Sequence, residues 1–216
     1  TLYANADGVL AKEITTSENM LDRYILAKAK AAVLQVQAGM DAYDTPSATE
    51  AITQFFEVLN NWYIRRSRPR FWGEEMTADK QAAYDTLFTV LSLMCRAAAP
   101  LLPFVSEAVY RGLHGDAASV HLTDFPDVNE DANLSDMILI GDMDNARDIC
   151  NAALAVRNAA NIRVRQPLAK LTAYFAMEQT WNNEAELEYY MQMICDEVNV
   201  KDVIIAESKE IEEVAT

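Results

Sequence analysis

Four arginines alternate with aromatic residues in one short run of the sequence. Residues 60–72 read Asn-Asn-Trp-Tyr-Ile-Arg-Arg-Ser-Arg-Pro-Arg-Phe-Trp. A guanidinium group can donate two parallel hydrogen bonds to a phosphate, and an aromatic ring offers a face on which an unstacked base can lie. The run therefore predicts RNA contacts made by Arg65, Arg66, Arg68, Arg70 and Trp72.

The same residue types also fit an internal role, and their spacing does not decide between the two. Arginines near the C-terminal end of a helix favour its dipole and pair with acids such as Glu57. Trp62 and Tyr63 continue an apolar stripe of helical period, so we expect Trp62 in the core. Trp72 is then the more accessible of the two tryptophans in the run.

A second basic stretch follows the last long helical pattern and contains Arg157, Arg163 and Arg165. Arg163 and Arg165 alternate with the apolar Ile162 and Val164, which predicts that both arginines point to one side of an extended segment. They could bind RNA together with the first run. They could equally bind helix carbonyls or the acidic residues nearby.

The sequence lacks the patterns that support catalysis or metal binding. There are two histidines, His114 and His121, and the three cysteines lie far apart at positions 95, 150 and 195. This spacing fits neither a zinc site nor a disulfide framework, and no glycine-rich phosphate loop or nucleophile motif is present. We expect no catalytic site, metal or cofactor in this chain. Sparse cysteines and the lack of long apolar runs predict a cytoplasmic protein that does not enter a membrane.

The net charge of −15 is distributed unevenly. Residues 178–216 contain 11 acids and 2 lysines, and residues 116–148 contain 9 acids and 1 arginine, so the rest of the chain is close to neutral. Since charges act mainly within a Debye length of about 10 Å, a local basic patch can still bind a polyanion.

The apolar periodicity predicts a mainly α protein: an antiparallel helical bundle followed by a small strand–helix–strand unit. We expect helices at about 18–40, 45–68, 77–100, 103–113, 135–160 and 183–198, and strands at about 168–176 and 200–206. Ser17 is the expected N-cap of the first full helix, Pro69 should take Arg68 out of helical geometry, and residues 120–122 could form a brief strand. The predicted domains are a bundle at 1–165, whose first helix is cut short by the start of the sequence, an α/β unit at 166–206 and a frayed acidic tail at 207–216.

Five segments of the sequence occur in the order found in the C-terminal part of isoleucyl-tRNA synthetases, and the chain resembles that family over about residues 1–170. The segments are residues 21–26, 61–72, 99–107, 119–126 and 156–168. Valyl-, leucyl- and methionyl-tRNA synthetases share the helical bundle and a Pro-x-x-Pro-Phe motif. The Arg-Arg-Ser-Arg-Pro-Arg-Phe-Trp and Val-Arg-Gln-Pro-Leu runs are more typical of the isoleucyl branch.

The resemblance implies a class I anticodon-binding domain that binds the anticodon stem-loop of isoleucine tRNA. It also implies a parent enzyme, an isoleucine–tRNA ligase that uses ATP and Mg²⁺, with an upstream catalytic domain on the same polypeptide. The family's His-x-Gly-His and Lys-Met-Ser-Lys-Ser motifs do not occur here, so we expect this fragment to be a non-catalytic monomer. Two alternatives remain: the same domain of a valyl enzyme, or a helical protein-interaction module whose arginines bind within the chain.

Overall fold

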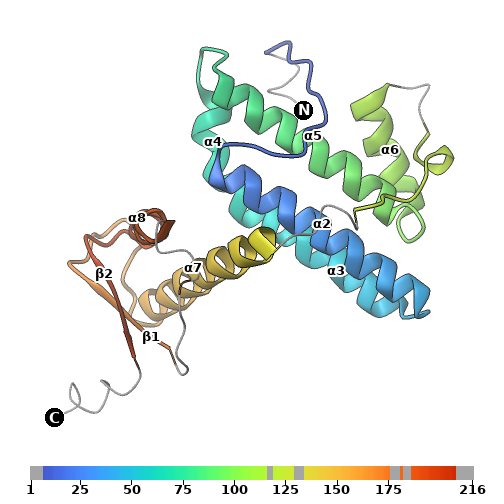
Figure 1. The fold of residues 1–216 in the computed structure, drawn as a ribbon. Helices are drawn as coiled ribbons and strands as arrows, with labels where there is room; N and C mark the ends of the chain where they lie inside the picture. Colours follow the sequence, from blue (N-terminus) through green and yellow to red (C-terminus); the bar gives the residue numbers. More distant parts are fainter. Residues whose placement is uncertain (1–6, 116–118, 129–133, 176–180, 182–185, 208–216) are drawn as a thin grey trace. The chain divides into compact units, whose positions relative to one another are not determined.

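The computed structural model describes residues 7–115, 119–128, 134–175, 181 and 186–207. The chain divides into two compact units, residues 1–136 and residues 137–216. The expected truncated first helix and most of the expected acidic tail fall largely outside the described residues. Figure 1 shows the elements of each unit.

The first unit is an antiparallel helical bundle, as the sequence predicts. Its elements are α2 (Met20–Asp41), α3 (Thr45–Val58), the π-helix η1 (Leu59–Ile64), α4 (Arg65–Trp72), α5 (Ala78–Ala98), α6 (Pro103–His114) and the 3-10 turn η2 (Val120–Leu122). Tyr63 returns to the start of α2, where its hydroxyl donates to Asp22. His114 returns to the middle of α5, where its Nε2 lies 2.8 Å from the Ser92 Oγ. The helical segment from α3 through η1 therefore runs back along α2, and α6 folds back toward α5 (Figure 1).

Polar side chains fix where the long helices begin. The Asn19 side chain accepts from the Leu21 N–H, Asp44 accepts from Ser47, and Thr77 accepts from Lys80. These bonds satisfy backbone donors that have no partner within the helix. The prediction of Ser17 as the first N-cap is wrong by two residues, because the Ser17 hydroxyl instead donates to the Asp22 carboxylate at 2.9 Å.

Helices α2 and α3 pack closely at the end where the chain turns between them. Gly39 on α2 lies against the backbone of Ala48 on α3, so closely that an added Cβ would come within 3.0 Å of the Ala48 backbone nitrogen. The buried face of α2 includes Tyr24, Ile25, Val33 and Val36, and the facing side of α3 includes Ile52 and Phe55. Burial of these side chains is the main stabilising term for such a bundle.

Pro69 lies inside α4, so the prediction that it ends the helix is wrong. The segment 45–72 is helical throughout, passing from α3 through η1 into α4. A proline ring crowds the carbonyl four residues earlier, and a π-helix widens the turn just before that position. Arg68 therefore keeps helical geometry, and the residues around it follow helical spacing.

Residues 120–122 form a 3-10 turn where the sequence suggested a brief strand. The Val120 N–H donates to Glu107 Oε2 at 2.9 Å, and the Val120 side chain packs with Cys95, Ala99 and Tyr110. Val120 is thus buried against α5 and α6, and residues 120–122 do not pair with a strand.

The second unit contains most of α7 (Leu134–Ala159), then β1 (Leu171–Phe175), α8 (Leu187–Val198) and β2 (Val203–Glu207). The two strands are parallel, with Leu171 opposite Val203, and Leu168 forms a further bridge to Val200. Strand, helix and strand follow the predicted order. Asn199 ends α8 with a positive φ of 52°, a conformation that asparagine tolerates.

The sequence predicts a domain boundary after residue 165, whereas the division into compact units falls between residues 136 and 137. The reason is that α7 packs within the second unit. Ile149 and Ala153 of α7 line the same cavity as Leu171 and Ala173 of β1. Among the described helices, none is both long enough and apolar enough to cross a membrane.

Candidate nucleic-acid interface

Arg65, Arg68 and Trp72 lie on one exposed side of α4. Their spacing of three and four residues places them in a single row on a helix. Both arginines are exposed, and 59% of the Trp72 surface is accessible. Asn61 on η1 precedes the row by one turn, and its carbonyl accepts from the Arg65 Nε at 2.8 Å. We call Asn61, Arg65, Arg68 and Trp72 the α4 stripe.

Arg66 lies on a different side of the same helix. Its guanidinium carbon is 5.1 Å from the centre of the Trp62 ring, a cation–π distance. Trp62 is in the core, as predicted, with 4% of its surface exposed. Arg66 is therefore half-buried against the bundle and is less available to a ligand than Arg65 or Arg68.

Arg70 is part of an internal ion-pair network. Its Nη1 and Nη2 donate to the two oxygens of Asp22 at 2.7 and 2.8 Å, and its Nε donates to Asp79 at 2.8 Å. The Tyr63 hydroxyl also donates to Asp22, at 2.7 Å. Burial, together with the Asp22 charge, raises the pKa of Tyr63 well above its ordinary value, so this hydroxyl remains a donor. The network joins α2, η1, α4 and α5, which gives Arg70 a structural role.

A hollow of about 330 Å³ lies beside Trp72. It is lined by Asp7, Phe71, Trp72, Gly73, Glu74 and Lys80. The Lys80 ammonium is buried and binds Asp7 and the Gly73 carbonyl, each at 2.7 Å. The exposed carboxylate of Glu74 would repel a phosphate in this hollow. The same carboxylate could accept a hydrogen bond from the amino group of a base.

Arg157 is enclosed in the second unit, with 4% of its surface exposed. Its Nη2 donates to the carbonyls of Arg163, at 2.8 Å, Val164, at 3.2 Å, and Gln166. Because the guanidinium is buried in this way, it is not accessible to RNA. We therefore assign Arg157 a structural role in place of the predicted RNA contact.

Arg163 and Arg165 are both exposed, but the segment between them is not extended. The Gln166 N–H donates to the Arg163 carbonyl at 3.0 Å, which closes a turn around the Arg157 guanidinium. The prediction of an extended segment is therefore wrong, because three carbonyls converge on one buried cation. RNA binding by Arg163 and Arg165 stays a prediction.

The sequence analysis did not identify two residues that hold these arginines: Asn61, whose carbonyl binds Arg65, and Asp22, whose carboxylate binds Arg70. Asp22 occupies an otherwise apolar helical position between Leu21 and Tyr24, all three of them buried. A carboxylate at such a position needs a buried partner, and that requirement was the available signal. The partner is 48 residues away, so the signal alone could not identify it.

Comparison with known proteins identifies the domain. The family described as "Anticodon-binding domain of tRNA ligase" matches residues 22–173. The chain belongs to this family. The anticodon-binding domain thus covers the bundle and continues through α7 into β1 of the second unit.

The anticodon-binding domain is similar to part of several isoleucine–tRNA ligases. It is 43% identical to the isoleucine–tRNA ligase of Rickettsia bellii (strain OSU 85-389), over 97% of this chain and 20% of the relative. It is 40% identical to that of Wolbachia sp. subsp. Brugia malayi (strain TRS), over 97% of this chain and 21% of the relative. It is 41% identical to that of Wolbachia pipientis wMel, over 94% of this chain and 20% of the relative. The chain spans about a fifth of the length of these relatives, and the resemblance seen in the sequence is confirmed.

Proposed function

We propose that this anticodon-binding domain binds the anticodon stem-loop of isoleucine tRNA as part of an isoleucine–tRNA ligase. The observation that carries the proposal is the α4 stripe, in which two exposed arginines and an exposed tryptophan share one side of a helix. The ligase would act in the cytoplasm, and the remainder of its polypeptide would use ATP and Mg²⁺. Among the described residues, no group of three or more His, Cys, Asp and Glu side chains could hold a metal ion.

Each member of the stripe supports a different part of the binding. Arg65 and Arg68 can donate to backbone phosphates, which fixes the position of the RNA without reading its sequence. Trp72 can stack on a base of the unpaired anticodon loop. The hollow beside Trp72, with its carboxylate rim, would then accept from the exocyclic amino group of that base.

The overall negative charge does not oppose this binding at close range. The strongly acidic stretches of the sequence are residues 116–148 and 178–216, and neither includes the α4 stripe. Contacts between guanidinium and phosphate release counterions, which favours binding at physiological salt.

The test is a salt titration of tRNA binding by the wild-type chain and by Arg65→Ala/Arg68→Ala. We expect the double variant to bind about tenfold more weakly, since loss of two phosphate contacts costs at least about 1.4 kcal/mol. The slope of log K against log salt should fall by between about one and two units. Lys12→Ala/Lys201→Ala removes the same charge at exposed positions outside the stripe and should change binding much less.

Circular dichroism should show that both double variants are folded. A tRNA whose anticodon is replaced should bind more weakly than isoleucine tRNA to the wild type. Equal affinities and slopes for the two double variants would overturn the role of the α4 stripe. Equal affinities for the two tRNAs would overturn the proposal that the domain recognises the anticodon of isoleucine tRNA.

A second candidate function, protein interaction, is favoured by one side of α6. Phe104 is 88% exposed and Val105 63% exposed, and Leu102 and Val109 lie beside them with much of their surface accessible. An exposed apolar face of this kind usually packs against another surface. We propose that it docks another part of the ligase polypeptide.

The docking proposal is tested in a full-length ligase carrying Phe104→Ser/Val105→Ser. We expect the substitution to lower the unfolding temperature of the full-length protein while leaving that of this chain, and its tRNA binding, unchanged. Equal effects on the two proteins would mean that the face has no partner in the ligase.

A further inference from the structure

Lys80 is buried where the chain passes from α4 into α5, with 3% of its surface exposed. Its Nζ donates to the Gly73 carbonyl at 2.7 Å and forms an ion pair with the Asp7 carboxylate, also at 2.7 Å. A lysine is rarely buried unless its charge is paired, because removing an ammonium group from water is costly. Lys80 therefore joins three segments of the first unit: the N-terminal segment, the end of α4 and the first turn of α5.

The bond from Lys80 to Gly73 fixes the end of α4. Gly73 is the C-cap of this helix and directly follows Trp72. The last carbonyls of a helix have no partner within it, and a cation beside them also complements the helix dipole. On the other side of Trp72, the Phe71 ring packs on Tyr84 of α5, with 5.1 Å between the ring centres. Trp72 is thus exposed itself but lies between two neighbours that are anchored to α5.

Asp7 neutralises the buried ammonium group. Its Oδ2 is the oxygen that pairs with Lys80, and the same oxygen accepts from the Tyr84 hydroxyl at 2.8 Å. Hydrogen bonds from Lys80 and Tyr84 hold the pKa of Asp7 below its ordinary value, so the carboxylate is ionised at neutral pH. Loss of Asp7 would leave the Lys80 charge buried without this carboxylate, which disfavours the buried position of the lysine. Asp7 and Lys80 both line the hollow beside Trp72.

We propose that Lys80, together with Asp7, is a positioning residue for tRNA binding, which holds the Trp72 ring ready to stack on a base. The proposal rests on the proposed function, in which Trp72 contacts the unpaired anticodon loop. A ring that is already fixed loses less conformational entropy when a base stacks on it, so binding is tighter. Lys80 itself is too deeply buried to contact a phosphate. Its replacement should therefore weaken stacking without removing a phosphate contact.

The first test is a salt titration of tRNA binding by Lys80→Met, in which the new side chain is of similar length but cannot bind Gly73 or Asp7. We expect binding about three- to fivefold weaker than in the wild type, with an unchanged salt slope, because a buried and paired ammonium group displaces no counterions from RNA. A lower salt slope would overturn the proposal, since it would mean that Lys80 contacts a phosphate.

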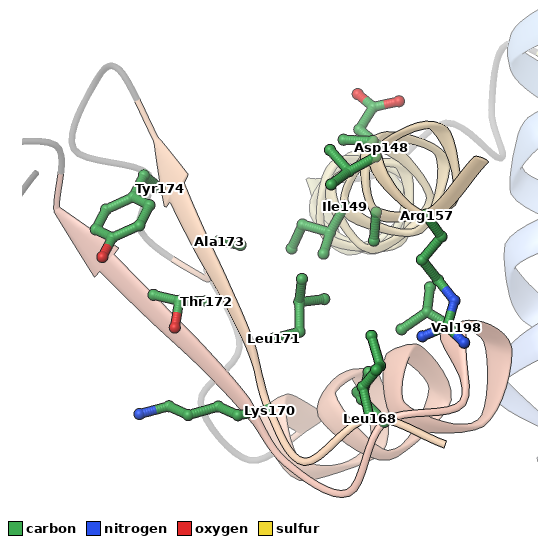
Figure 2. A pocket seen from close by; sticks show the side chains of 14 residues that line it. Asp148, Ile149, Arg157, Leu168, Lys170, Leu171, Thr172, Ala173, Tyr174 and Val198 are labelled. Atoms are coloured by element: carbon green, nitrogen blue, oxygen red, sulfur yellow. The ribbon is translucent and has the colours of Figure 1, made fainter. Parts of the chain in front are cut away.

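Lys170→Met is the matched control for Lys80→Met, because it removes the same charge in the second unit. Lys170 is exposed and directly precedes β1, and Figure 2 shows its side chain pointing away from α7. This control should change the affinity for tRNA by less than about 1.5-fold. An effect as large as that of Lys80→Met would overturn the proposal, since loss of charge alone would then explain both.

Variants of Asp7 test whether the pair acts through Trp72. Asp7→Ala should weaken tRNA binding as much as Lys80→Met does, and Asp7→Glu should restore most of the affinity because it returns the carboxylate. In a chain that already carries Trp72→Leu, Asp7→Ala should leave the affinity unchanged, since the ring to be positioned is absent. Equal weakening by Asp7→Ala with and without Trp72 would overturn the proposal.

The mobility of Trp72 can be measured without RNA, which separates failure of this proposal from failure of the proposed function. In Trp62→Phe/Trp181→Phe, Trp72 is the only tryptophan left in the chain. Adding Lys80→Met or Asp7→Ala should lower the anisotropy of its emission while circular dichroism shows a folded chain. Unchanged anisotropy would overturn the positioning role of Lys80. Lowered anisotropy, together with normal tRNA binding by Trp72→Leu, would instead overturn the stacking of a base on Trp72.

Discussion

The guanidinium of Arg70 donates to both oxygens of the Asp22 carboxylate, which is fully buried in the bundle. The two residues are 48 positions apart in the sequence and lie on different helices, α4 and α2. The hydroxyls of Tyr63 and Ser17 also donate to Asp22. The pair therefore fixes how the helix that presents the α4 stripe is held against the rest of the bundle.

Replacing Arg70 should destabilise the fold. Arg70→Ala leaves the Asp22 carboxylate buried without its cation, which typically costs about 3–5 kcal/mol. Arg68→Ala, two residues away and on the exposed side of the helix, should change the free energy of unfolding by less than about 0.5 kcal/mol. Urea denaturation followed by circular dichroism measures both. Similar values for the two variants would show that the Arg70–Asp22 pair does not stabilise the bundle.

The sequence could not separate these arginines because Pro69 was expected to end the helix. Once the helix continues to Trp72, its period places Arg65, Arg68 and Trp72 on one side and Arg66 and Arg70 on another. The family, the helical bundle and the order of the later strands were all predictable from apolar period and motif order. Whether an arginine is exposed or internal depended on Asp22, which pairs with Arg70 from 48 residues away in the sequence. Apolar period does not report such a tertiary contact.

Gly39 should not tolerate a methyl group. A Cβ at this position would lie 3.0 Å from the Ala48 backbone N and 3.1 Å from the Asp44 carbonyl oxygen. Because backbone atoms cannot move aside easily, Gly39→Ala should lower the free energy of unfolding by about 1–3 kcal/mol.

Gly112 on α6 provides the matched control for Gly39. A Cβ there would meet nothing within 4 Å, so Gly112→Ala should stabilise the helix by about 0.5–1 kcal/mol. Opposite shifts in unfolding temperature are expected for the two variants. A stabilised Gly39→Ala would mean that α2 and α3 do not approach as closely as described.

Glu107 should make the stability of the first unit depend on pH. Partial burial opposes its ionisation, but the Val120 N–H, the Ser119 hydroxyl and Arg111 together hold its pKa below the ordinary value. A lowered pKa in the folded state stabilises the protein above the unfolded pKa, near 4.3, and that contribution disappears as the pH falls through the folded pKa. Thermal unfolding between about pH 7 and pH 3 should show this loss in the wild type.

Glu107→Gln should weaken that acid dependence, because the amide does not titrate. Glu57→Gln removes an exposed carboxylate of α3 and serves as the control. An identical acid dependence for the wild type and Glu107→Gln would contradict the prediction. The bonds from Glu107 to Ser119 and Val120 also explain why residues 120–122 do not form the suggested strand: a side chain on α6 holds the turn, and sequence period does not report such a contact.

Cysteine reactivity should follow burial. All three cysteines are free, with Cys95 and Cys150 buried and Cys195 half-buried. Burial raises the pKa of Cys95 to about 11, so only on the order of one molecule in a thousand carries the thiolate at pH 8. A disulfide reagent should therefore modify Cys195 first in the native chain and reach the others after denaturation. Cys195→Ser should abolish the early reaction, and its persistence in that variant would contradict the prediction.

Trp72 should contribute to tRNA binding in a way that salt does not alter. Stacking of a base on an aromatic ring is worth about 1–3 kcal/mol and releases no counterions. Trp72→Leu should therefore weaken binding about fivefold or more while leaving the salt slope at the wild-type value, in contrast to Arg65→Ala/Arg68→Ala. Trp72 is exposed whereas Trp62 is in the core, so quenching of tryptophan emission on tRNA addition should disappear in Trp72→Leu and persist in Trp62→Phe. A changed salt slope with quenching intact in Trp72→Leu would show that the ring positions the neighbouring arginines and does not itself stack on a base.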